Sequence, residues 1–184
     1  MITKDWQTAS NLLAERKVGV IPTDTIYGIS CLAFDKNSVE KIYKIKQRDF
    51  NKPFIILIPS IKDLNRFGIS ITSNEKIILN KYWPGPVSIV LNVEDERYEF
   101  LHRGTKTLAF RLPDYSGLNK LLSRTGPLVS TSANISNTKS AKSIEEAIEI
   151  FKNTVDFYLD VGPLNNPPSK IIRIENGEEV IIRS

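Results

Sequence analysis

The 184-residue sequence contains one cysteine and one histidine. A single cysteine excludes a disulfide within the chain, and Cys31 with His102 cannot form a Cys/His metal cage. Cys31 lies in an apolar segment and His102 in a charged one, so neither suggests a Ser-His or Cys-His nucleophilic couple. We therefore expect Cys31 to pack in the core, His102 to lie in a solvated loop, and any metal to arrive with a substrate.

Long hydrophobic runs are also missing. The apolar runs 53–59 and 87–93 are far shorter than the ~20 residues that a membrane helix needs. Residues 1–16 mix acidic and polar side chains, unlike a signal peptide, so we expect a cytoplasmic protein with no membrane attachment. No linker rich in glycine, serine or proline divides the chain, and 41% hydrophobic residues suffice for one core. The sequence thus predicts a single domain over residues 1–184.

Charge is mildly positive, with a formal net charge of +4 and a pI near 9.1. This balance fits a protein that binds phosphates or RNA, but it also fits many ordinary proteins. The positive charge is concentrated between residues 41 and 52, where Asp49 is the one acid. Two interpretations stay open, a solvated helix face and a phosphate-binding surface, for the cations Lys41, Lys44, Lys46, Arg48 and Lys52.

Apolar spacing predicts alternating helices and strands. Capping-box patterns at 72–75 and 143–146 mark two helix starts, and the Asn176-Gly177 pair is typical of a hairpin turn. The alternation predicts an α/β fold with a mixed sheet. We expect helices near 6–13, 37–47, 72–83, 118–122 and 144–151, and strands near 18–21, 54–58, 87–93, 107–112, 128–129, 155–159, 170–174 and 180–183.

Polar clusters fall at the predicted ends of these elements: Thr23-Asp24-Thr25, Lys46 and Arg48 with Lys52, Thr107 with Arg111, and residues 130–134. Cations together with hydroxyl and amide groups are what a nucleotide-phosphate site requires. Neither a GxxxxGK[ST] loop nor a GxGxxG fingerprint is present. Asp24 could orient Thr25 or a substrate amine, or it could cap backbone amides, and the sequence leaves these alternatives open.

Three motifs, in order along the chain, resemble those of the YrdC-like threonylcarbamoyl-adenylate synthases. They are Pro-Thr-Asp-Thr-Ile-Tyr-Gly at 22–28, Lys46-x-Arg48 and Ser132-x-Asn134, supported by 83–86, 108–113 and Ser169. The resemblance runs from about residue 17 to the C-terminus and is to the short, single-domain form. It implies a YrdC-like twisted open mixed sheet with flanking helices and a concave basic site. Asn137 and Lys170 depart from the family pattern, although asparagine tolerates the left-handed backbone that such a loop needs.

The resemblance implies a nucleotidyltransferase that makes threonylcarbamoyl-AMP and pyrophosphate from L-threonine, bicarbonate and ATP. The product would serve the threonylcarbamoyl modification of tRNA adenosine beside the anticodon, through separate tRNA-modifying proteins. Mg²⁺ would be carried mainly by the ATP phosphates. One alternative is a non-catalytic RNA-binding YrdC-like module. Another is the carbamoyl-adenylate chemistry of hydrogenase-maturation carbamoyltransferases, whose zinc-finger-like cysteines this sequence lacks.

By the same resemblance, three groups of residues receive roles. Lys46 and Arg48 would be catalytic, stabilising charge on the phosphates as pyrophosphate leaves. L-threonine would contact Thr25, Arg111, Ser130 and Ser169. ATP would contact Arg48, Lys52, Thr107, Ser132, Asn134, Ser140 and Arg183, and no residue would serve as a resident metal ligand.

Overall fold

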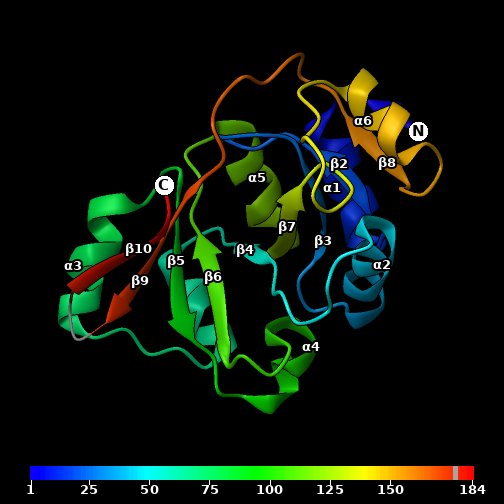
Figure 1. Cartoon of the computed structure of the whole chain (residues 1–184). Helices are drawn as coiled ribbons and strands as arrows, with labels where there is room; N and C mark the ends of the chain where they lie inside the picture. The colour runs from blue at the N-terminus through cyan, green and yellow to red at the C-terminus, as the bar shows by residue number, and fades with distance from the viewer. Residues whose placement is uncertain (176–177) are drawn as a thin grey trace.

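One mixed sheet organises the protein in the computed structural model, which describes residues 1–175 and 178–184 (Figure 1). The strands follow the spatial order β1-β8-β2-β3-β7-β4-β6-β5-β9-β10. This arrangement confirms the predicted α/β class and the open mixed sheet. The strands are β1 (Ile2–Thr3), β2 (Gly19–Ile21), β3 (Gly28–Leu32), β4 (Ile55–Leu57), β5 (Val87–Asn92), β6 (Thr107–Arg111), β7 (Leu128–Ser132), β8 (Phe157–Leu159), β9 (Lys170–Glu175) and β10 (Glu178–Arg183).

Helices lie before, between and beside these strands. Each predicted helix is present, with ends shifted by a few residues. The short helices η1, η2 and α4 and the two-residue strand β1 were not predicted, because they are too short to show a clear period. Strand β3 was also not predicted, although it is longer than three of the predicted strands. The helices are α1 (Trp6–Ala14), α2 (Lys36–Lys46), η1 (Ile61–Phe67), α3 (Ser73–Tyr82), η2 (Glu96–Tyr98), α4 (Glu99–His102), α5 (Ser116–Thr125) and α6 (Ile144–Phe151).

Local signals set several of these boundaries. Thr72 and Glu75 form the predicted capping box at the start of α3. At α6 the box is half formed, because Ser143 accepts from the amide of Glu146 while the Glu146 carboxylate accepts from the amide of Lys142 at 2.8 Å. Strands β9 and β10 pair antiparallel as predicted, and the predicted turn at 176–177 lies outside the described residues.

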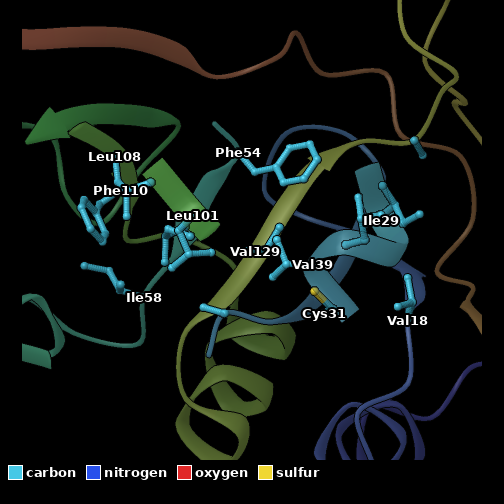
Figure 2. Packing of buried hydrophobic residues seen from close by; sticks show 14 of the residues in the cluster. Val18, Ile29, Cys31, Val39, Phe54, Ile58, Leu101, Leu108, Phe110 and Val129 are labelled. Atoms are coloured by element: carbon cyan, nitrogen blue, oxygen red, sulfur yellow. The ribbon is translucent and has the colours of Figure 1, made fainter. Parts of the chain in front are cut away.

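The two faces of the sheet bury different side chains. Strand residues alternate between faces, so Ile56 and Val129 enter one core cluster while their neighbours Leu57 and Leu128 enter a second one beneath α1 and α5. Figure 2 shows part of the first cluster, with Val129 near Val39 of α2. Part of the sheet face that α1 and α5 cover continues uncovered toward β9 and β10, and this leaves room for a site.

Cys31 and His102 are both buried. The thiol of Cys31 is fully enclosed in the first core cluster, which confirms its predicted packing role, and burial raises its pKa. The prediction for His102 was wrong: it is 3% exposed and ends the short helix α4. Its Nδ1 accepts from the amide of Gly104, and this local turn withdraws the imidazole from solvent.

Among the described residues, no helix combines the length and apolar character that crossing a membrane requires.

Candidate active site

A cavity of about 1020 Å³ opens on the uncovered part of the sheet. Its floor consists of alternate residues from neighbouring strands, such as Ile55 and Leu57 of β4 or Ala109 and Arg111 of β6. The residues between them, Ile56 and Phe110, face the hydrophobic core. The period-2 geometry of the strands therefore turns one side of the sheet to the first core cluster, while the other side both packs in the second cluster and lines the cavity.

Arg111 is buried at the cavity wall, with a side chain 5% exposed. Its Nη1 donates to Thr25 Oγ1 at 3.1 Å, and its Nη2 lies 3.2 Å from Oδ1 of Asp24. Thr25 Oγ1 in turn lies 2.9 Å from Thr23 Oγ1. Burial lowers the pKa of Arg111, and the charge of Asp24 opposes that shift. The turn at 22–28 and strand β6 thus present one fixed guanidinium, which is suited to binding a carboxylate.

Two buried serine hydroxyls line the same cavity. Ser130 Oγ accepts from Ser30 Oγ at 3.1 Å, and Ser169 Oγ lies 3.0 Å from Ser88 Oγ. Gly28 leaves space for this arrangement, because a Cβ there would lie 2.6 Å from Ser130 Oγ. Ser130 and Ser169 are therefore each held by a serine outside the cavity lining, and Ser169 Oγ also accepts from Arg183 Nη2 at 3.2 Å.

Arg183 ties the last strand to the cavity wall. Its Nη2 and Nε donate to the carbonyl of Ser169 at 2.6 and 3.2 Å. Burial lowers the pKa of Arg183, and the positive charge of Arg48 adds to this effect. Two guanidinium groups that lie far apart in the sequence, those of Arg48 and Arg183, therefore line one cavity, an arrangement suited to phosphate groups.

Further cations were missed by sequence reasoning. Lys139, Lys142 and Arg173 also line the cavity, whereas Glu146 is the one acidic side chain that lines it among the described residues. The two lysines follow the Ser132-x-Asn134 motif within eight positions. Their position shortly after that motif is the sequence feature that could have indicated further cations at the cavity.

Lys46 lies beneath the cavity rather than in its lining. Lys46 is 1% exposed. Its Nζ donates to the carbonyls of Ser132 and Asn134 at 2.6 and 2.8 Å, and to Asn134 Oδ1 at 2.9 Å. Burial, with a further contribution from the charge of Arg48, lowers the pKa of Lys46 to about 7. The Lys46-x-Arg48 and Ser132-x-Asn134 motifs are therefore joined through this ammonium.

Most of the predicted site residues line the cavity. Lys46 and Asn134 form its support, and the exposed side chain of Lys52 lies 4.0 Å from Asp49 rather than in the lining. Lys52 contributes its carbonyl, which accepts from Arg48 Nε at 3.0 Å. Nine of the twelve residues that were given roles line the cavity: Thr25, Arg48, Thr107, Arg111, Ser130, Ser132, Ser140, Ser169 and Arg183. The roles of all twelve residues stay predictions.

The segment 160–169 passes along the cavity between β8 and β9, at the top of Figure 1. Leu164, Asn166 and Pro168 line the cavity from this segment, and Asn166 Nδ2 donates to the carbonyl of Asp24 at 3.2 Å. Lys170, which departs from the family pattern, is not among the lining residues. The other departure, Asn137, has φ of 66°, the left-handed conformation that asparagine tolerates.

Comparison with known proteins decides the family. The Sua5/YciO/YrdC family profile, described as "Telomere recombination", matches residues 11–184. The chain belongs to this family. A relative in Methanocaldococcus jannaschii, described as a putative threonylcarbamoyl-AMP synthase, is 32% identical over 168 residues, which cover 91% of this chain and 79% of that protein. The threonylcarbamoyl-AMP synthase of Pyrococcus abyssi is 28% identical over 98% of this chain, which spans 54% of that relative's length.

Solved structures of Sua5/YciO/YrdC proteins share the fold. Pyrococcus abyssi Sua5 complexed with L-threonine superposes with a TM-score of 0.86 at 28% identity, over 97% of this chain and 53% of that one. Escherichia coli YciO also gives a TM-score of 0.86, at 22% identity over 100% of this chain and 93% of that one. The YciO likeness establishes the fold alone. Together they confirm the resemblance that the three motifs indicated.

The cavity offers few side chains that could bind a resident metal ion. In residues 1–175 and 178–184, no group of three or more His, Cys, Asp or Glu side chains is placed to hold an ion. The cavity offers cations and hydroxyls instead. Magnesium prefers carboxylate oxygens, so this donor set does not fit a resident magnesium ion.

Proposed function

We propose that the protein synthesises threonylcarbamoyl-AMP from L-threonine, bicarbonate and ATP, releasing pyrophosphate and water. The observation that carries the proposal is the chemistry of one cavity. Buried Arg111 lies at its wall with the hydroxyls of Thr25, Ser130 and Ser169. Five further cations line the cavity: Arg48, Lys139, Lys142, Arg173 and Arg183. The names of the moderately similar relatives point to the same reaction.

The amino acid would bind where acceptors and donors are already fixed. The guanidinium of Arg111 would hold the carboxylate of L-threonine, and the hydroxyls of Thr25, Ser130 and Ser169 would orient the rest of the molecule. Pyrococcus abyssi Sua5, which has the same fold, was solved in complex with L-threonine. The amine would then combine with bicarbonate to give a carbamate, with loss of water.

ATP would bind on the basic side of the cavity. The carbamate oxygen would attack the α-phosphorus, and the bond to pyrophosphate would break. Arg48, with Lys139, Lys142 and Arg183, would stabilise the developing charge, together with a magnesium ion on the phosphates. Thr107, Ser132 and Ser140 would donate hydrogen bonds to the nucleotide. No side-chain nucleophile is needed for this chemistry.

Lys46 would act from beneath the cavity. In our proposal its ammonium fixes the loop that begins at Ser132, so that Ser132 and Ser140 face the nucleotide. Asn134 would complete this support. Lys52 would contribute mainly by accepting from Arg48 through its carbonyl.

The product would be handed to tRNA-modifying proteins in the cytoplasm. An RNA-binding module without catalysis remains the alternative from a different class. Not all of the cations at 41–52 are free to bind RNA, because Lys41 pairs with Asp156 at 2.7 Å and Lys46 is buried. Lys44 and Lys52 remain exposed.

Pyrophosphate release from MgATP tests the proposal. We expect release that requires both L-threonine and bicarbonate, each omitted in turn, with threonylcarbamoyl-AMP as the product identified by mass. Folded protein that releases no pyrophosphate, yet binds tRNA with an affinity that falls steeply with salt, would support the RNA-binding alternative. Turnover of carbamoyl phosphate in place of L-threonine and bicarbonate would indicate carbamoyl-adenylate chemistry.

A further inference from the structure

We propose that Asp24 is a positioning residue that sets the affinity for the amino-acid substrate by holding the guanidinium of Arg111 at the cavity wall. The proposal rests on the proposed function, since the ligand is the carboxylate of L-threonine. Asp24 is not among the residues that line the cavity, whereas Arg111 is. Asp24 therefore acts on the ligand through Arg111 rather than by touching it.

The ion pair between these residues is shielded from water. The side chains of Arg111 and Asp24 are 5% and 6% exposed, and Nη2 lies 3.2 Å from Oδ1. A buried pair of this kind interacts more strongly than a surface pair, and removal of one partner leaves the other charge uncompensated. Asp24 thus supplies the counter-charge that allows a buried guanidinium to remain at the cavity wall.

The contacts of Arg111 fix its orientation at two nitrogen atoms. Nη2 faces Asp24 and Nη1 donates to Thr25 Oγ1 at 3.1 Å, while Nε has no hydrogen-bond partner among the described residues. An arginine side chain that is ordered before binding loses less conformational entropy when it captures a carboxylate. Nη1 and Nη2 each carry a second N–H, so the guanidinium keeps donor capacity for that ligand.

Asp24 makes two further contacts, at its Oδ2 and at its carbonyl. Its Oδ2 accepts from the amide of Asp114 at 3.4 Å, and its carbonyl accepts from Asn166 Nδ2 at 3.2 Å. Its carboxylate makes no hydrogen bond to Thr25 in the described structure. Oδ1 makes no hydrogen bond among the described residues, and the long amide contact at Oδ2 is a weak cap. The ion pair with Arg111 is therefore the closest polar contact of this carboxylate.

Calorimetric titration of L-threonine into the full chain, with and without a non-hydrolysable ATP analogue, tests this role. We expect Asp24→Asn to weaken binding about tenfold and to raise the KM for L-threonine while the KM for ATP stays within twofold. Asp156→Asn is the matched control, because Asp156 also pairs with a cation and accepts from a backbone amide but lies outside the cavity lining. Its L-threonine affinity should stay within twofold of wild type.

A double-mutant cycle separates positioning from general destabilisation. If Asp24 acts through Arg111, then Asp24→Asn should lower kcat/KM for L-threonine about tenfold in the wild-type background but less than twofold in an Arg111→Lys background. Equal losses in both backgrounds, or wild-type affinity in Asp24→Asn, would overturn the inference and leave the proposed function intact. Wild-type protein that binds no L-threonine under either condition would overturn both.

Discussion

The Nζ of Lys46, in the last turn of α2, lies 2.9 Å from the Oδ1 of Asn134, in the loop after β7. The same Oδ1 accepts from Ser132 Oγ at 2.6 Å, and Asn134 Nδ2 donates to the carbonyl of Thr138 at 2.7 Å. One buried ammonium thus organises a loop that carries Ser140 and Lys139 to the cavity. Protonated Lys46 has three N–H groups for three acceptors, and the neutral amine has two.

Stability should depend on pH through Lys46. Its pKa is about 7 in the folded protein and near 10.5 in an unfolded chain, so between these values the unfolded chain binds the extra proton. The free energy of unfolding of wild type, minus that of Lys46→Met, should therefore rise with pH above 7, by at most about 1.4 kcal/mol per pH unit. Urea unfolding at pH 7 and pH 9 measures it, and a difference that falls with pH would contradict the prediction.

Arg48→Ala should lower turnover by about 100-fold with little loss of stability. The Arg48 guanidinium lines the cavity and is held by the carbonyls of Lys52 and Pro53, so its charge is preorganised for phosphates. Steady-state pyrophosphate release is the measurement. Arg97→Ala is the control, because Arg97 is exposed and pairs with Asp95 away from the cavity. Equal losses in both variants would show that the effect is not local.

Arg183→Ala should raise the KM for both ATP and L-threonine. The side chain lines the part of the cavity where we propose that ATP binds, and it also holds the carbonyl of Ser169, which we propose lies beside L-threonine. Arg183→Lys should recover part of the ATP effect, since it restores the charge but not the two-donor contact. A change confined to the KM for ATP would contradict the proposed link to Ser169.

Glu146→Gln should lower the KM for ATP by roughly twofold to threefold. Glu146 is the one acidic side chain in the described cavity lining, so its charge repels phosphates, while glutamine keeps an oxygen for the amide of Lys142. Glu149→Gln, on the same helix and outside the lining, is the matched control. An unchanged KM for ATP at low salt would show that Glu146 lies too far from the phosphates.

The sequence predicts local structure and the main motifs well, because the signals for both are local. The capping box at Thr72 and the apolar run that forms β4 depend on neighbouring residues. The pairing of Asp24 with Arg111 depends on how the turn at 22–28 meets β6, and the sequence carries no signal for it. The sequence left open whether the cations at 41–52 form a solvated face or a phosphate-binding surface, and neither interpretation predicts the burial of Lys46 by tertiary contacts. His102 is likewise buried, although the sequence predicted a solvated loop. That the chain is one domain stays a prediction.

The division of strand residues between core and cavity has a consequence for engineering. Changing Ile55 or Ala109 to reshape the floor also shifts Ile56 or Phe110, which pack in the core. Variants at these positions that alter ligand preference are therefore expected to lower the stability of the fold. Leu164 and Pro168 approach the same ligand space from an irregular segment. A library confined to residues 163–168 should therefore yield altered substrate range with a higher fraction of folded members than one confined to the strands.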